Sequence, residues 1–168
     1  AASAAGAEET ADLFTVYNIA KESAALKRSA IEYVVIYKAT GFGAGPTEEM
    51  EDGVPSGCLH GVPVAGLCNV YHPSDFALAE IEMRERARAG QANETPDPSK
   101  VYFTCKPGSP DRFWCPKDRK NAQSDNGGLG PDYVGVYMKV HHNWLTSLFM
   151  DESDITDQSA VKIEPRRL

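Results

Sequence analysis

The sequence has no long hydrophobic run, and its longest uninterrupted apolar stretch, Tyr33–Tyr37, is far shorter than the roughly 20 residues that span a bilayer. We therefore predict no membrane-spanning segment within it. Positive charge is also scarce, since 17 Lys and Arg stand against 24 Asp and Glu, for a net charge of -7. Surfaces that bind nucleic acid or anionic membranes need clustered basic residues, so this balance argues against both functions.

The chain opens with AASAAGAEETAD and lacks an initiator methionine, a basic n-region and an apolar h-region. We therefore expect a mature or trimmed chain whose upstream part is missing. Its 168 residues, with 42% hydrophobic and 24% charged side chains, are typical of one soluble domain covering residues 1–168.

Motifs that carry catalysis or bind cofactors are missing as well. There is no GxSxG, HExxH, GxxxxGK[ST] or EF-hand loop. The glycine-rich GFGAGP is interpreted as a turn, because Pro46 and acidic residues follow where a helix N-terminus would receive phosphate. The sequence thus predicts a protein that is not an enzyme, with no catalytic residues, no cofactor and no metal site.

The histidines and one acidic cluster are the remaining candidates for chemistry. His141 and His142 are consecutive at the end of a predicted strand, so their side chains should point to opposite faces and not share one metal ion. We interpret them as satisfied or solvent-facing, against the alternatives of a metal ligand or a general base. The cluster of Asp151, Glu152, Asp154 and Asp157 is interpreted as a solvated acidic turn, with a calcium site as the alternative.

What the sequence does have is an even set of cysteines: Cys58, Cys68, Cys105 and Cys115. Four cysteines allow three connectivities, and sequence alone does not choose rigorously among them. Loop closure favours sequential neighbours, which predicts Cys58–Cys68 and Cys105–Cys115. A zinc site normally needs CxxC-like pairs, which are absent, and free thiols are the other alternative. Disulfides would indicate an oxidising compartment.

Residues 8–30 are predicted to form a helix with a wide buried face. At 100° per residue, one stripe contains Leu13, Val16, Tyr17, Ala20, Ala24 and Ile31. Acidic residues near its start and basic residues near its end suit the helix dipole. Ile19 and Leu26 lie roughly 120–140° away from this stripe, on a second side of the helix.

The remaining elements predict an α+β domain with one antiparallel sheet. Residues 32–39 form the strongest predicted strand, and its nearly continuous apolar character suggests a central position in the sheet. Further strands are predicted near 101–105, 133–141 and 159–164. Residues 74–90 are predicted to form a second helix, capped by Ser74 or Asp75 and carrying Phe76, Leu78, Ile81 and Met83 as its apolar members. Residues 41–73 and 117–131 are expected to be loops.

Several segments resemble TadE-like proteins, the minor pseudopilins of the bacterial tight-adherence (Flp-type) pilus. PDYVGVYMKVHHNWLTSLF (131–149) and SAVKIEPR (159–166) are similar to the C-terminal half of that family. IEYVVIYKATG (31–41), a cysteine loop ending in CNVY (68–71), and the entry AGAEETADL (5–13) resemble its actinobacterial branch. The resemblance covers about half of the chain, and the second cysteine pair does not map onto it.

This resemblance implies a pilin-like fold, with an N-terminal helix packed on one antiparallel sheet and disulfide-stapled loops. It implies a non-enzymatic subunit for assembly, priming or tip structure of a Tad pilus, supporting adhesion. Its partners would be other pilin or pseudopilin subunits, with a prepilin peptidase and a membrane assembly platform acting on the full-length form. The present chain would then be an extracytoplasmic domain lacking its leader and its one N-terminal membrane helix. Ile19 and Leu26 become a candidate assembly contact.

Two other functions remain open from the sequence. The chain is also compatible with a secreted adhesin-like binding module that holds a surface partner through exposed loops at 40–57 and 121–131. A secreted hydrolase centred on His141 or His142 is the third hypothesis.

Overall fold

We describe residues 8–23, 31–39, 50–51, 53–120, 132–143 and 152–162, as placed in a computed structural model of the chain. The helices are α1 (Ala11–Glu22), α2 (Ser56–Leu59) and α3 (Pro73–Ala92), with the short 3₁₀ turns η4 (Pro98–Lys100) and η5 (Pro116–Asp118). The strands are β1 (Ile31–Ala39), β2 (Met50–Glu51), β3 (Val54–Pro55), β4 (Cys68–Tyr71), β5 (Tyr133–Asn143) and β6 (Glu152–Lys162). The predicted α+β fold is confirmed.

The main sheet is antiparallel and has the strand order β4-β1-β5-β6, while β2 and β3 form a separate small pair. β1 lies between two neighbours, with Val35 opposite both Val70 of β4 and Tyr137 of β5. Its central position, predicted from its continuous apolar character, is therefore confirmed.

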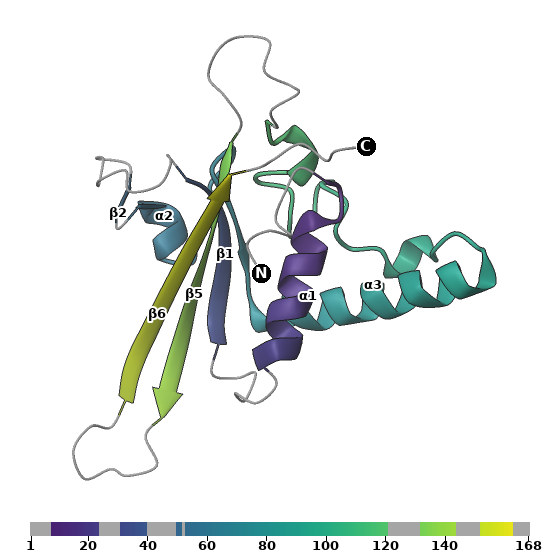
Figure 1. Ribbon diagram of the computed structural model, residues 1–168, viewed down its shortest axis with the longest axis horizontal. Coiled ribbons are helices and arrows are strands. Elements are labelled where there is room, and N and C mark those ends of the chain that lie inside the picture. The colour runs from purple at the N-terminus through teal and green to yellow at the C-terminus, as the bar shows by residue number, and fades with distance from the viewer. Residues whose placement is uncertain are drawn as a thin grey trace.

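The two faces of this sheet bury two different clusters. α1 and α3 cover one face, and α2 with the Cys58–Cys68 loop covers the other (Figure 1). β1 serves both, because Val34 and Ile36 join the cluster under the helices while Tyr33, Val35 and Tyr37 join the opposite one. On the helix side the cluster also contains Leu13, Val16, Ala20, Tyr71, Phe76, Ala79, Phe103, Trp114, Val134, Val136 and Val140.

One close approach in the sheet fixes the identity of a residue. Gly135 of β5 lies opposite Tyr37 of β1, and a Cβ at Gly135 would fall 2.1 Å from Cζ of the Tyr37 ring. Tyr37 is itself buried, with 3% of its surface exposed. The ring therefore packs flat across the glycine, and no other residue fits there without displacing it.

The predicted first helix is too long. α1 ends at Glu22, and Ile31, which the wheel assigned to the helical stripe, instead begins β1 opposite Val140. The Ser23 hydroxyl donates to the Ile19 carbonyl at 2.6 Å, so this side chain competes for the last helical acceptors at the end of α1. The predicted members Ala24 and Leu26 lie outside the described residues.

One strand prediction and one loop prediction are also wrong. Residues 101–105 make no strand pairing, since the Tyr102 and Phe103 amides donate to the Glu82 carboxylate rather than to another strand. Conversely, residues 41–73 were expected to be a loop, yet they include α2 and the strand β4. The last strand is longer than 159–164 and begins at Glu152.

α3 begins at Pro73 and uses His72, not Ser74 or Asp75, as its N-cap, while the Asp75 carboxylate accepts the His72 amide at 2.8 Å. Its predicted apolar face is only partly correct, because Ile81 is 41% exposed whereas Glu82 and Glu85 are buried. Among the helices of the described residues, none has both the length and the apolar character to cross a bilayer.

Candidate functional site

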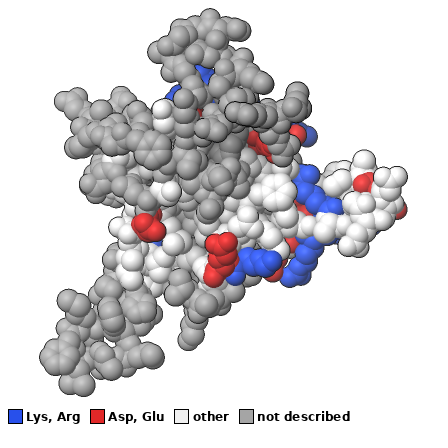
Figure 2. Space-filling view, in the orientation of Figure 1, with Lys and Arg blue, Asp and Glu red and all other residues white. Residues whose placement is uncertain are grey.

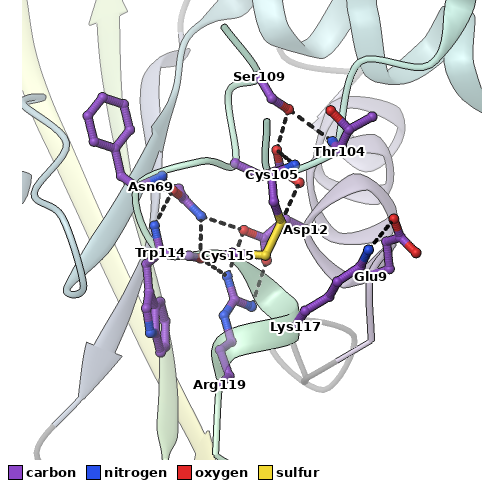
Figure 3. Close-up of a disulfide and its surroundings, with 12 residues drawn as sticks. Glu9, Asp12, Asn69, Thr104, Cys105, Ser109, Trp114, Cys115, Lys117 and Arg119 are labelled. Atoms are coloured by element: carbon purple, nitrogen blue, oxygen red, sulfur yellow. Dashed lines mark hydrogen bonds and ion pairs between the residues drawn. A yellow bond between two sulfur atoms is a disulfide. The ribbon is translucent and has the colours of Figure 1, made fainter. Parts of the chain in front are cut away.

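A group of buried polar side chains joins elements that are far apart in the sequence. Asp12 comes from α1, Asn69 and Tyr71 come from β4, and Arg119 follows η5. Asp12, Asn69 and Tyr71 are fully buried and Arg119 is 3% exposed. We call these four residues the polar junction. In Figure 3, Asp12, Asn69 and Arg119 point toward one another beside the second disulfide.

Asp12 is the acceptor at the centre of the polar junction. Its Oδ2 accepts from the Tyr71 hydroxyl at 2.5 Å, from Nδ2 of Asn69 at 3.0 Å and from Nη2 of Arg119 at 2.7 Å. Nη1 of Arg119 lies 2.7 Å from Oδ1 of the same carboxylate. A buried charge needs both a counter-ion and hydrogen bonds, and Asp12 has both.

Asn69 and Arg119 connect this carboxylate to the second disulfide loop. The Asn69 side chain accepts from the Phe113 and Trp114 amides at 3.0 and 2.9 Å and donates to the Trp114 carbonyl at 2.8 Å. The Arg119 guanidinium lies 4.2 Å from the centre of the Trp114 ring and donates to the same carbonyl at 3.2 Å. Residues 113–119 are thereby fixed to β4 and α1 by side chains instead of strand pairing.

The environment of Tyr71 keeps its hydroxyl protonated. Burial raises the pKa of Tyr71 well above its usual value of 10.0, and the neighbouring Asp12 carboxylate raises it further. A neutral Tyr71 is a hydrogen-bond donor, which is the role that Asp12 requires of it.

A second buried carboxyl group lies inside the Cys105–Cys115 loop. Asp111 is fully buried, and its Oδ1 accepts from the Cys105 amide at 3.0 Å. The Ser109 hydroxyl accepts from the Thr104 amide at 2.9 Å and contacts both the Tyr102 carbonyl and the Asp111 carboxyl group. Ser109 has one hydroxyl proton for these two oxygens. Burial raises the pKa of Asp111, and a proton on Asp111 would supply the missing donor.

We expect the stability difference between Asp111→Asn and the wild type to depend on pH. Because the folded-state pKa of Asp111 is raised, the stability that its protonated form contributes is present below the unfolded value near 3.8 and is lost as pH rises through the folded value. The asparagine variant cannot lose this contribution, so its unfolding free energy relative to wild type should increase from pH 4 to pH 7. Urea unfolding at several pH values measures it.

Asp118→Asn is the matched control, because it removes the same charge at an exposed position of η5. A stability difference for Asp111→Asn that stays constant over this pH range, or that changes in the opposite direction, would contradict the assignment.

Two carboxylates of α3 hold the segment that leads into the second disulfide loop. Oε2 of Glu82 accepts from the Tyr102 and Phe103 amides at 2.6 and 3.0 Å, and Arg86 pairs with Oε1 at 2.7 Å.

Glu85 accepts from the Asp97 amide at 3.1 Å and pairs with Arg88 at 2.6 Å. Hydrogen bonds from Arg88, followed by that of the Asp97 amide, lower the pKa of Glu85 to about 2. Figure 2 shows the resulting mixture of acidic and basic side chains over α3.

The predicted disulfides are confirmed. Cys58 pairs with Cys68 and Cys105 pairs with Cys115, which leaves no free cysteine in the chain and excludes the zinc and free-thiol alternatives. Cys105 has a positive φ of 59°, which is uncommon outside glycine, and the disulfide and the Asp111 carboxyl group hold its backbone there.

No protein-family model matches this chain, and no curated protein or solved structure matches it. The TadE-like resemblance therefore remains a prediction.

The structure gives the positions of the two histidines that the hydrolase hypothesis names, both of which lie on β5. His141 is half-buried on β5 in register with Asp154 of β6. His142 follows it opposite Ser153, and its side chain is outside the described residues. His60 and His72 are exposed.

The acidic cluster is not the turn that we predicted. Glu152, Asp154 and Asp157 lie on the strand β6, and Asp151 is outside the described residues. Positions 154 and 157 belong to opposite faces of a strand, so this backbone does not bring them together as calcium ligands. Within the described part of the chain, no three His, Cys, Asp or Glu side chains are grouped to hold a metal ion.

Of the two residues in the candidate assembly contact, the structure describes only Ile19. Ile19 is half-buried and packs against the core cluster, although it lies away from the predicted buried stripe. Leu26 lies outside the described residues. The exposed large hydrophobic residue of α1 is Phe14, with 39% of its surface exposed.

The polar junction was not predicted from the sequence, although one signal was present. Asp12 lies four residues before Val16, so the spacing places it on the buried stripe of α1. All four side chains have hydrogen-bond partners inside the protein, and Asp12 is fully buried. The chemistry of this arrangement is that of a structural clamp, which holds α1, β4 and residues 113–119 together.

Proposed function

We propose that this chain is the extracytoplasmic domain of a TadE-like minor pseudopilin, a non-enzymatic subunit for assembly, priming or tip structure of a Tad pilus. The observation that carries the proposal is the N-terminal helix α1 packed on an antiparallel sheet, together with the segments that resemble the family. The two disulfides support a site of action in an oxidising compartment, at the cell surface or in the envelope.

The polar junction gives α1 a mechanical role in such a subunit. Asp12 lies in the first turn of α1 and is tied directly to β4 and to Arg119. Leu13 and Val16 bury the same end of the helix in the core. A helix fixed at its N-terminal end transmits force from anything attached there to the sheet. A filament subunit requires this coupling between its helical part and its globular part.

Gene deletion in the cells that encode the protein tests the proposal. We expect the deletion strain to lose its pili in electron micrographs and to regain them with the wild-type gene. A fully piliated deletion strain would reject the pseudopilin function. Piliated cells that no longer adhere would favour the secreted binding module instead.

Two exposed residues provide a matched pair for the same complementation. Phe14 of α1 and Ile81 of α3 are similarly exposed, at 39% and 41%. If α1 contacts neighbouring subunits, Phe14→Asp should leave as few pili as the deletion, whereas Ile81→Asp should restore normal numbers. Both purified variants should melt close to the wild type, because neither residue is buried. Equal piliation by the two variants would contradict a role for this face of α1.

A further inference from the structure

β6 is an edge strand whose outer side has no partner among the described residues. It pairs with β5 along its whole length of 11 residues, from Glu152 opposite Asn143 to Lys162 opposite Tyr133. β1 pairs with β5 only as far as Val140, so the β5–β6 hairpin continues beyond the rest of the sheet (Figure 1). An 11-residue edge is roughly 36 Å long. Every second residue turns its N–H and C=O groups away from β5.

This edge lacks most of the features that keep edge strands from pairing with other chains. Residues 152–162 contain no proline, and the β5–β6 register runs through all of them without a bulge. Ile155, Thr156, Asp157 and Ser159 are exposed, and these residues belong to both faces of the strand. At these four positions an incoming strand would find exposed side chains, and β6 has no neighbouring strand on its outer side among the described residues.

The charge of β6 decides which strand fits. The strand carries Glu152, Asp154 and Asp157 against a single basic residue, Lys162. Antiparallel pairing of two copies centred on Asp157 would place the two Asp157 residues directly opposite each other, and like charges in that position are destabilising. The net charge of -7 adds repulsion between whole chains. A second copy is thus disfavoured, and a basic strand is favoured.

We propose that β6 is a docking edge for an extended, lysine- or arginine-rich segment of another protein, which adds a fifth strand to the main sheet. Backbone hydrogen bonds along the edge give the affinity, and basic residues opposite Asp157 and its acidic neighbours select the partner. This inference does not depend on the pilus proposal, since it uses only the strand order, the exposure and the charge of β6.

Binding of defined peptides to the purified 168-residue chain tests the proposal. The probe is the fluorescein-labelled peptide KTKVKTKVKTK with blocked ends, and its charge-reversed counterpart is ETEVETEVETE. A third peptide keeps the lysines but is N-methylated at four consecutive central residues, which removes donors from both of its edges. Fluorescence anisotropy measures the binding, and a salt concentration of about 0.15 M limits long-range electrostatic attraction. We expect only the first peptide to bind measurably.

Protein variants then locate the site. Asp157→Lys should weaken binding of the lysine peptide by about fivefold or more, because it replaces an attractive cross-strand pair with a repulsive one. Ser159→Lys, at another exposed position of the strand, should also weaken it. Asp118→Lys makes the same charge change on the exposed surface of η5 and should leave binding unchanged.

Several results would overturn the proposal. One is equal binding of the N-methylated peptide, which would mean general electrostatic attraction without strand pairing. Another is an equal loss of binding for Asp157→Lys and Asp118→Lys. A concentration-dependent dimer that Asp157→Lys changes would assign the edge to a second copy of the chain.

Discussion

Replacing Arg119 with methionine should lower the free energy of unfolding by about 3–5 kcal/mol, because the Asp12 carboxylate would stay buried without its counter-ion. Arg119 supplies two contacts of 2.7 Å to Asp12, one to each carboxylate oxygen. Tyr71 and Asn69 would still donate to that carboxylate, but they are neutral and leave its charge uncompensated. Urea unfolding followed by circular dichroism measures the loss.

The double variant separates the ion pair from the other contacts of Arg119. Asp12→Asn with Arg119→Met removes both charges, so its loss should be clearly smaller than the sum of the two single losses. Lys117→Met is the matched surface control, since Lys117 and Glu9 form a pair of 2.7 Å with both side chains about half exposed. It should change stability by less than about 1 kcal/mol. Additive single losses would show that the buried pair is not coupled.

Removing the second disulfide should cost about 2–5 kcal/mol in the variant Cys105→Ser/Cys115→Ser. The bond closes a sequence separation of 10 residues, which limits the conformations of the unfolded chain. It also holds Cys105 at positive φ and borders Trp114, which contacts both Asn69 and Arg119. The effect should therefore extend beyond the loop to the polar junction.

The first disulfide provides the matched comparison, because Cys58–Cys68 has the same separation of 10 residues but packs on the opposite face of the sheet. We expect Cys105→Ser/Cys115→Ser to reduce the coupling energy between Asp12 and Arg119, measured by repeating the double-mutant cycle in that background. Cys58→Ser/Cys68→Ser should leave the coupling nearly unchanged. The same coupling in both backgrounds would show that the second loop does not support the polar junction.

The elements that sequence predicted well are those whose side chains carry a local pattern. β1 is dense in Val, Ile and Tyr and β5 in Val and Tyr, and such β-branched and aromatic runs are typical of strands buried in a sheet. The disulfides were predictable because loop closure favours neighbouring cysteines. In contrast, β4 is only four residues long, which is too short for a recognisable pattern. Residues 101–105 resemble a strand locally, but the Tyr102 amide donates to the Glu82 carboxylate and not to a neighbouring strand.

The place of Arg119 in the polar junction was unpredictable for a different reason. Arg119 stands in a run of charged residues that looks like any solvated surface, and its partner Asp12 lies 107 residues away. Nothing in the local sequence distinguishes it from Lys117, which is exposed. The burial of Glu82 and Glu85 has the same origin, because the backbone amides that donate to their carboxylates come from residues 97–103, a segment without regular strand pairing.

The separation between Asp12 and Arg119 also bears on the order in which the chain folds. α1 is made before the later segments that it contacts, so its buried carboxylate has no counter-ion until residue 119 has emerged, and the sheet under it lacks β5 until residues 133–143 follow. Contacts of such long range close large loops and therefore form late and slowly. Synthesis or export from the N-terminus consequently delivers a first half that lacks both the counter-ion of Asp12 and the β5 side of the sheet. The fold is completed only with the second half, when α1, β1 and β5 come together.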